Sequence, residues 1–208
     1  MGFYSDRILP RGIDWVMRGR DFSELRKKYL REVKGDVLEI GFGSGLNLPH
    51  YPSSISKLIA LDPSRLGRRL ASRRISDSPF PVQFVDWDNG TIDLPDHSMD
   101  SVVTTWTLCT IPDVGQALNE IKRVLKKEGT YFFVEHGQSP DIRVARFQGW
   151  WNPLQNKLAG GCHVNRPMEQ LISAGGFKIE QLDNFYMAGP KIFSYMFCGW
   201  ARVDGRPG

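Results

Sequence analysis

The sequence lacks any apolar run that approaches the roughly 20 residues a helix needs to cross a bilayer. Its first residues also lack the apolar core of a secretory signal peptide. Only three cysteines are present, Cys109, Cys162 and Cys198, an odd number placed far apart along the chain. A disulfide framework is therefore not expected, and a reducing, cytoplasmic setting is favoured.

The chain also lacks a linker, an internal repeat or a low-complexity tract, so we expect a single domain over residues 1–208. Its net charge of +4 is unevenly placed, because residues 1–34 hold nine Lys or Arg against five Asp or Glu and the remainder is balanced. The basic residues are interleaved with acids, and no known nucleic-acid module is visible. A solvated helix face explains this pattern, and no nucleic-acid partner is expected.

Short apolar runs alternate with helical patterns along most of the chain. Strands are expected over residues 37–40, 57–61, 82–85, 100–105 and 130–135. Helices are expected over residues 65–75 and 114–125. Asp113 is placed to cap the second of these helices, and Gly129 follows its end. The alternation predicts an α/β fold with a doubly wound, mostly parallel, seven-stranded sheet.

Three segments depart from this alternation. Residues 12–34 have the pattern of one helix, which Gly35 ends. Residues 178–184 and 192–203 resemble the strands of a C-terminal antiparallel hairpin with no helix between them. Residues 141–165 form an insertion rich in aromatic residues and glycine, and it is placed to cover a ligand beyond the carboxyl ends of the strands.

The glycine turn after the first strand is the most informative segment. Gly41, Gly43 and Gly45 follow the strand, but Leu46 stands where a dinucleotide-binding loop has its third glycine. An acid, Glu39, lies inside the strand itself. A glycine turn next to such an acid suits a cationic ligand without phosphate, such as S-adenosylmethionine (SAM), better than a dinucleotide.

Several motifs together resemble the class I SAM-dependent methyltransferases from about Asp36 onward. They are V-L-E-I-G-x-G-x-G at 37–45, the acid Asp62, D-W-D at 86–88, D-S-V-V at 100–103 and V-L-K-K-x-G at 124–129, where K-P-G-G is more usual. Four further motifs resemble a bacterial branch of that family: L-P-H-Y-P, T-W-T-L-C-T-I-P-D, F-V-E-H-G and A-G-G-C-H-x-N-R-P. The branch is related to the membrane-associated alkyl-thiol methyltransferases of animals, and some of its members are called phospholipid N-methyltransferases.

This resemblance implies a SAM-binding core over residues 35–208, with S-adenosylhomocysteine as the product. Glu39 would face the amino end of the methionine moiety, and Asp62 would accept hydrogen bonds from both ribose hydroxyls. Asp88 would accept the adenine amino group, with the backbone of Asn89 nearby. The other residues expected at the cofactor are Gly41, Phe42, Gly43, Gly45, Asn47, Pro63, Thr105 and Trp106.

Some residues have competing roles. Asp62 is also a candidate N-cap, with Pro63 at the first helical position.

Methyl transfer needs mainly alignment, and a base helps only an acceptor that arrives protonated. His136 and His163 are expected to face the acceptor and are the catalytic candidates. Cys162 and His163 look like half a zinc site, but no second pair at zinc spacing exists, so no metal is expected.

The sequence therefore predicts a methyltransferase for a small apolar or amphipathic acceptor, a thiol or an amine, with a lipid head group among the candidates. A non-catalytic SAM-binding domain is the alternative, and an NAD(P)-dependent oxidoreductase has less support. No Asn-Pro-Pro-Tyr-like motif of a nucleic-acid methyltransferase follows the fourth strand. Residues 1–34 are expected to cover the SAM site as a lid or to lie on an anionic membrane surface. The oligomeric state is not defined by the sequence.

Overall fold

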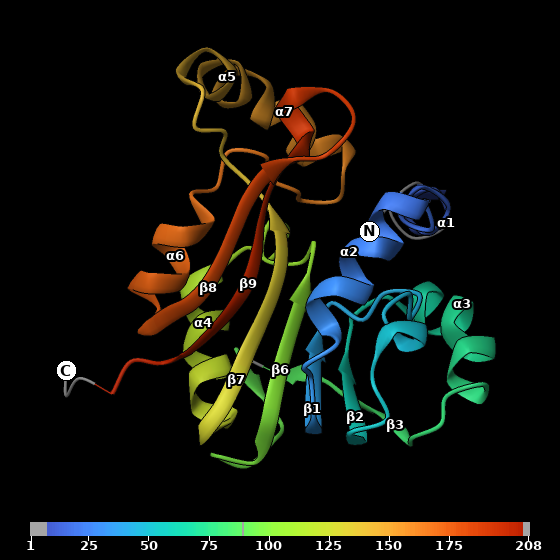
Figure 1. Cartoon of the computed structure of the whole chain (residues 1–208). Coiled ribbons are helices and arrows are strands. Elements are labelled where there is room, and N and C mark those ends of the chain that lie inside the picture. Colours follow the sequence, from blue (N-terminus) through green and yellow to red (C-terminus); the bar gives the residue numbers. More distant parts are fainter. Residues whose placement is uncertain (1–7, 89, 206–208) are drawn as a thin grey trace.

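The computed structural model describes residues 8–88 and 90–205, and its centre is a seven-stranded sheet (Figure 1). The strands are β1 (Gly35–Ile40), β2 (Ile55–Leu61), β3 (Val82–Val85), β6 (Met99–Thr105), β7 (Leu125–His136), β8 (Phe177–Tyr186) and β9 (Tyr195–Val203). Their order across the sheet is β3-β2-β1-β6-β7-β9-β8. In this order, the first five strands (β3, β2, β1, β6 and β7) are parallel to one another, and β9 runs antiparallel to both of its neighbours. The predicted fold class is confirmed.

Helices pack on both faces of the sheet. They are α1 (Leu9–Met17), α2 (Arg20–Leu30), α3 (Arg65–Ser76), α4 (Val114–Val124), α5 (Ile142–Leu158), α6 (Met168–Ala174) and α7 (Lys191–Ser194), with a 3₁₀ turn at Leu48–His50. Buried side chains of α4 and α6 pack on one face, where they join Tyr131 and Phe133 of β7. On the other face α2 contributes Leu30 and α3 contributes Ala71. Among the described residues, no helix is both long enough and apolar enough to cross a membrane.

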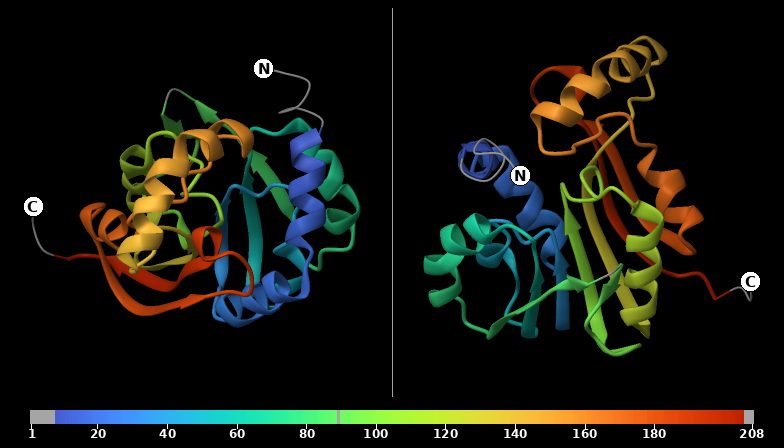
Figure 2. Two further views of the ribbon diagram at one scale, coloured as in Figure 1. Left: turned by 90° about the horizontal axis from the view of Figure 1, so that it is seen from above. Right: turned by 180° about the vertical axis from the view of Figure 1, so that it is seen from behind.

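The N-terminal helical region differs from the prediction. The expected single helix over residues 12–34 is two helices, and the second ends at Leu30. Gly19 separates them with extended backbone angles (φ −52°, ψ 149°), and a Cβ there would lie 3.2 Å from the carbonyl oxygen of Val16. The chain therefore turns sharply at Gly19. Figure 2 shows α1 running across one end of the molecule, away from the sheet on which α2 packs.

Two further expectations were wrong in detail, and one feature was not predicted. The helix capped by Asp113 ends at Val124, so Gly129 lies inside β7 and does not follow the helix directly. A four-residue helix, α7, interrupts the connection between the last two strands. A small second sheet, β4 (Trp87–Asp88) with β5 (Thr91–Ile92), was not foreseen because strands of two residues leave no periodic pattern. The antiparallel pairing of β8 with β9 is confirmed.

The segment over residues 141–165 is mainly a helix. Asp141 caps α5 by accepting a hydrogen bond from the backbone N–H of Arg143. Pro153 lies inside this helix, where it removes one backbone donor. Figure 1 shows α5 and α1 at the same end of the molecule, the end toward which β6 and β7 point. This is the end of a doubly wound sheet at which ligands bind.

Candidate functional site

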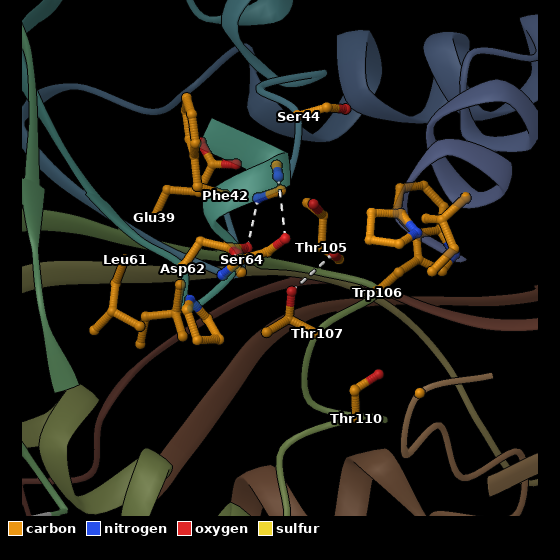
Figure 3. Close-up of a pocket in the computed structure, with 18 of the residues that line it drawn as sticks. Glu39, Phe42, Ser44, Leu61, Asp62, Ser64, Thr105, Trp106, Thr107 and Thr110 are labelled. Atoms are coloured by element: carbon orange, nitrogen blue, oxygen red, sulfur yellow. Dashed lines mark hydrogen bonds between the residues drawn. The ribbon is translucent and has the colours of Figure 1, made fainter. Parts of the chain in front are cut away.

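A cavity of about 960 Å³ lies at the carboxyl ends of β1, β2 and β6. Such a volume is sufficient for a ligand of nucleoside size. One wall consists of the glycine turn, the end of β2 and the loop after β6, several of whose residues are drawn in Figure 3. The other wall consists of α1 and residues 159–161 at the end of α5. Strand ends and helices that are far apart in the sequence thus enclose one site.

The glycine turn has a fixed shape. The backbone N–H groups of Gly41 and Phe42 both donate to the carbonyl oxygen of Leu61, which ties the turn to the end of β2. Gly41 has a φ of +80°, and a Cβ at this position would lie 2.0 Å from Oγ1 of Thr107. Only glycine fits such a place, because a side chain would meet both strain and a clash. The turn therefore lies close against the loop after β6.

Glu39 is a buried acid at the cavity. Its Oε1 accepts a hydrogen bond of 2.9 Å from Nδ2 of Asn47, and its Oε2 accepts one of 2.8 Å from the hydroxyl of Tyr51. Burial raises the pKa of Glu39 to about 8, although these hydrogen bonds and the charge of Arg26 act in the opposite direction. A carboxyl group so placed gains a strong partner when a ligand ammonium enters.

Asn47 connects this acid to the helical region. Nε of Arg26 in α2 donates a 2.9 Å hydrogen bond to Oδ1 of Asn47, and Nδ2 of Asn47 also donates to Oγ1 of Thr105. The Arg26 guanidinium is buried, lies 4.9 Å from the centre of the Trp106 ring and donates to the carbonyl oxygen of Met17. Burial lowers the pKa of Arg26 to about 10. One buried network therefore joins α1, α2, β1 and β6.

Asp62 lies at the end of β2, beside the glycine turn (Figure 3). Its Oδ2 accepts a 2.7 Å hydrogen bond from the N–H of Gly43, and its Oδ1 accepts one of 2.7 Å from the N–H of Ser64. The N-cap of α3 is Ser64, whose hydroxyl accepts from the N–H of Gly67, so Asp62 is not the cap residue. Each carboxylate oxygen keeps a free lone pair for a ligand hydroxyl.

Glu135, a fully buried acid of β7, holds the loop after β6 in place. Its carboxylate accepts hydrogen bonds from the backbone N–H groups of Thr107 and Leu108. Burial raises the pKa of Glu135 to about 7, against the effect of these donors. Trp106 in this loop has a φ of +50°, which is rare for a bulky residue. The Trp106 ring packs edge-on against Phe22 of α2, which helps to offset the backbone strain.

Part of the segment expected to hold the adenine ring lines the cavity. Asp86 and Trp87 are lining residues, together with Pro63 and Val85. Asp88 is exposed and is not among the lining residues. Asn89 lies outside the described residues, so its predicted role stays a prediction.

Helix α1 contributes a buried acid to the cavity wall. Asp14 is only 6% exposed, and its Oδ1 accepts a 2.6 Å hydrogen bond from the hydroxyl of Ser44 in the glycine turn. Arg74 of α3 lies 3.6 Å from the same oxygen, and Arg18 pairs with the other carboxylate oxygen. These contacts fix α1 over the glycine turn. Because Asp14 and Ser44 are 30 positions apart, no local pattern predicts their contact.

The two histidines expected to face the acceptor lie outside the cavity lining. His136 is buried, and its Nε2 lies 3.1 Å from Sγ of Cys162. His163 is placed between two amides, with Nδ1 at 3.0 Å from Nδ2 of Asn152 and Nε2 at 2.9 Å from Nδ2 of Asn156. Their catalytic role stays a prediction.

The structure brings together most of the residues predicted to bind the cofactor. The predicted residues that line the cavity are Glu39, Gly41, Phe42, Gly43, Asn47, Asp62, Pro63, Thr105 and Trp106. Gly45 lies behind the turn, where a Cβ would contact Leu48 and Ala71. Sequence reasoning missed Asp14, Arg26, Tyr51, Thr107 and Glu135. Of these, Glu135 carried a signal of its own, as an acid inside an apolar strand, and Tyr51 and Thr107 lie within motifs that resemble the bacterial branch.

A methyltransferase domain model matches residues 38–133, the segment from β1 to β7. The thiol S-methyltransferase of Mus musculus is 30% identical over 168 residues, which cover 78% of this chain and 68% of the relative. The phosphatidylethanolamine N-methyltransferase of Cereibacter sphaeroides is 30% identical over 164 residues, 78% of each chain. The thiol S-methyltransferase of Rattus norvegicus is matched over 66% of its length, so this chain spans about two thirds of such relatives.

A solved structure has the same fold at low sequence identity. The SAM-dependent methyltransferase of Aquifex aeolicus superposes with a TM-score of 0.64 at 16% identity. The match covers 93% of this chain and 98% of that chain. The structural likeness therefore extends well beyond residues 38–133.

Proposed function

Since the chain belongs to the family of SAM-dependent methyltransferases, we propose that it transfers a methyl group from SAM to the sulfur of a small apolar thiol. The choice of acceptor rests on the cavity. Its helical wall is lined mainly by apolar side chains, and no histidine of residues 8–88 and 90–205 is among the lining residues. The mouse relative is likewise named a thiol S-methyltransferase.

The residues at the strand ends fit the cofactor. Glu39 offers a buried carboxyl group to the amino end of the methionine moiety, and Asp62 offers two carboxylate oxygens to the ribose hydroxyls. The glycine turn lets the backbone come close to the ligand, since Gly41 and Gly43 both have positive φ angles. When bound, SAM supplies an activated methyl group that an acceptor takes by in-line displacement. What the chain supplies is alignment and exclusion of water.

The second wall fits an apolar acceptor. Leu9, Ile13 and Met17 of α1 line this wall, and across the cavity Ile111 and Pro112 add apolar side chains from the loop after β6. The acids of the cavity that could attract a cationic acceptor are already engaged: Asp14 binds Ser44 and two arginines, and Asp86 binds Arg68. This wall therefore favours an uncharged alkyl group over an ammonium group.

The absence of a histidine from the described lining favours sulfur over nitrogen. An alkyl ammonium has a pKa near 10, so it must lose a proton before it can accept a methyl group, and this needs a base. A thiol ionises to a thiolate, and this sulfur anion is so strong a nucleophile that the small fraction present near neutral pH can react without a base held by the protein. The predicted catalytic roles of His136 and His163 are not needed for such an acceptor.

A matched series of acceptors tests this proposal. Alkyl thiols of rising chain length and the primary amines of the same length are incubated with protein and SAM, and S-adenosylhomocysteine is measured. We expect turnover with thiols that rises with chain length, and little with amines. Faster methylation of the amines, or of phosphatidylethanolamine in vesicles, would replace the thiol by an amine acceptor. Binding of S-adenosylhomocysteine without turnover of either series would favour a non-catalytic SAM-binding domain.

We also propose that α1 and α5 touch an anionic membrane surface. Trp15 on α1 is 78% exposed, and Trp150 on α5 is 73% exposed. On α5, Phe147, Leu154 and Leu158 are exposed on the same side of the helix as Trp150. Exposed basic residues accompany them at Arg18, Arg143, Arg146 and Lys157. Exposed aromatic side chains next to basic ones are typical of peripheral membrane helices.

Co-sedimentation with anionic vesicles tests this surface. We expect binding at low salt that weakens as salt screens the basic residues. Trp150→Ala should weaken it, whereas Trp200→Phe on β9 serves as a control at a distant, partly buried tryptophan. If the protein does not bind anionic vesicles even at low salt, the two helices only cover the cavity, and the expected cytoplasmic setting needs no membrane contact.

A further inference from the structure

Three side chains that could bind a metal lie close together beside the cavity. Cys109 comes from the loop after β6, His136 from the end of β7 and Cys162 from the loop between α5 and α6. One potential ligand atom of each lies within 4.8 Å of the others, and all three residues are buried. Nε2 of His136 is 3.1 Å from Sγ of Cys162, and the thiol of Cys109 also hydrogen-bonds Cys162.

The backbone around these side chains is held in place. The N–H of His163 donates a 2.8 Å hydrogen bond to the carbonyl oxygen of Cys109, which places the two cysteine segments side by side. The N–H of Cys162 donates to the carbonyl oxygen of Ala159. Arg166 hydrogen-bonds the carbonyl oxygen of Leu108, the residue before Cys109. The cluster is therefore preorganised, and little backbone order has to be gained when a ligand binds.

We propose that Cys109, His136 and Cys162 form a binding site for one Zn²⁺ ion. Two sulfurs and an imidazole nitrogen are the donors that zinc prefers. In a tetrahedral site, Zn–S bonds of about 2.3 Å place two sulfurs about 3.8 Å apart. A cluster whose ligand atoms lie within 4.8 Å of one another needs only a small contraction to reach this geometry. On binding, the cluster releases two protons to solvent, so that both sulfurs are thiolates and the imidazole is neutral in the complex.

The fourth position of the ion is open to a small ligand. Among the described residues, the group contains no fourth His, Cys, Asp or Glu. Thr110, which follows Cys109, lines the cavity, and so does Gly161, which precedes Cys162. Three protein ligands with a fourth place for water or another small molecule are typical of zinc sites that do more than stabilise a fold. The site goes beyond the proposed methyl transfer, and it does not depend on the identity of the acceptor.

Binding of the ion would join two loops that line the cavity to the end of β7. Cys162 follows directly after Gly160 and Gly161, which have positive φ angles and line the cavity. Cys109 belongs to the loop whose beginning Glu135 holds. An ion that bridges both loops would order this part of the cavity wall.

Cobalt substitution tests the site directly. The full chain is reduced, freed of metal with a chelator and titrated with Co²⁺ alone. We expect one equivalent to bind, with the strong visible bands of a tetrahedral ion and thiolate-to-cobalt absorption in the near ultraviolet. Zn²⁺ should then displace it at one equivalent. Because the spectrum of the unaltered protein carries the result, the test does not depend on whether a variant folds.

Variants assign the ligands. Cys162→Ala and His136→Ala should each weaken Co²⁺ binding by more than about 100-fold, since losing a ligand costs more than losing its supporting hydrogen bond. Cys198→Ala is the matched control, because Cys198 is also a buried free cysteine but lies on β9 outside the cluster. It should bind as the unaltered protein does. No stoichiometric binding under reducing conditions, or a cobalt spectrum without thiolate absorption, would overturn the proposal.

Discussion

The two walls of the cavity are built in different ways. The strand-end wall is polar and fixed: Glu39 and Asp62 are each bound by two donors, and the glycine turn is tied to β2 by backbone hydrogen bonds. The helical wall is mainly apolar, with Asp14 as its buried acid. Helices α1 and α5 also present Trp15 and Trp150 to solvent. A wall of fixed dipoles recognises one ligand, whereas a wall of apolar side chains on separate helices adapts to acceptors of different shape.

The largest effect is expected from a methyl group added to the fixed wall. Gly41→Ala would place a Cβ 2.0 Å from Oγ1 of Thr107 at a φ of +80°. Strain and overpacking together should lower the free energy of unfolding by about 2 to 5 kcal/mol. Gly12→Ala on the helical wall is the control, because nothing lies within 4 Å of its Cβ and alanine favours a helix. Chemical denaturation checks both, and equal effects would erase the proposed difference between the walls.

The next effect concerns the cofactor. Asp62→Ala should weaken S-adenosylhomocysteine binding by about 100-fold, since two hydrogen bonds to a charged acceptor contribute roughly 3 kcal/mol. Asp88→Ala, in the exposed segment, should change it less, because Asp88 lies outside the cavity lining. Calorimetric titration measures both variants. Asp62→Asn keeps one acceptor oxygen and distinguishes a lost ligand contact from a collapsed turn, and a normal affinity in Asp62→Ala would remove this residue from the site.

A smaller effect is expected from pH. Burial raises the pKa of Glu39 to about 8, and only its ionised form pairs with the ligand ammonium. As pH rises from 7 to 8.5, the ionised fraction and hence the affinity for S-adenosylhomocysteine should increase roughly eightfold. In Glu39→Gln this rise should vanish. The same slope in both proteins would mean that another group controls binding.

The smallest effect should come from the contact between the walls. Asp14→Asn weakens the hydrogen bond from Ser44 and the pairing with Arg18 and Arg74. We expect about a fivefold loss of S-adenosylhomocysteine affinity, since a single hydrogen bond contributes near 1 kcal/mol, and faster proteolysis within α1. Asp21→Asn, at an exposed acid of α2, is the control. An unchanged cleavage pattern in Asp14→Asn would show that α1 is held by its apolar contacts alone.

The same difference explains which features could be predicted from the sequence. Strand periodicity and the alternation of strands with helices place Glu39, the glycines and Asp62 of the strand-end wall at one edge of the sheet. The contacts of Asp14 with Ser44 and of Arg26 with Asn47 join residues 30 and 21 positions apart through the docking of helices. No periodic pattern encodes such docking.

The cysteine–histidine cluster could not be predicted for a related reason. Cys162 was weighed with its neighbour His163, but the histidine beside its sulfur is His136, 26 positions earlier. His163 points to Asn152 and Asn156 instead. Metal-ligand spacing identifies pairs on one loop, whereas these ligands come from three segments that only the sheet brings together.

The position of α1 has a consequence for the order of events during turnover. Asp14 bonds to Ser44 within the glycine turn, and Leu9 and Ile13 line the cavity above it. Because α1 lies over the turn, we expect a nucleoside bound there to leave only after this helix lifts. We therefore expect the acceptor to enter and depart while the nucleoside stays bound, and we expect the departure of S-adenosylhomocysteine to limit the steady-state rate. A burst of methylated product in the first turnover would be its kinetic signature.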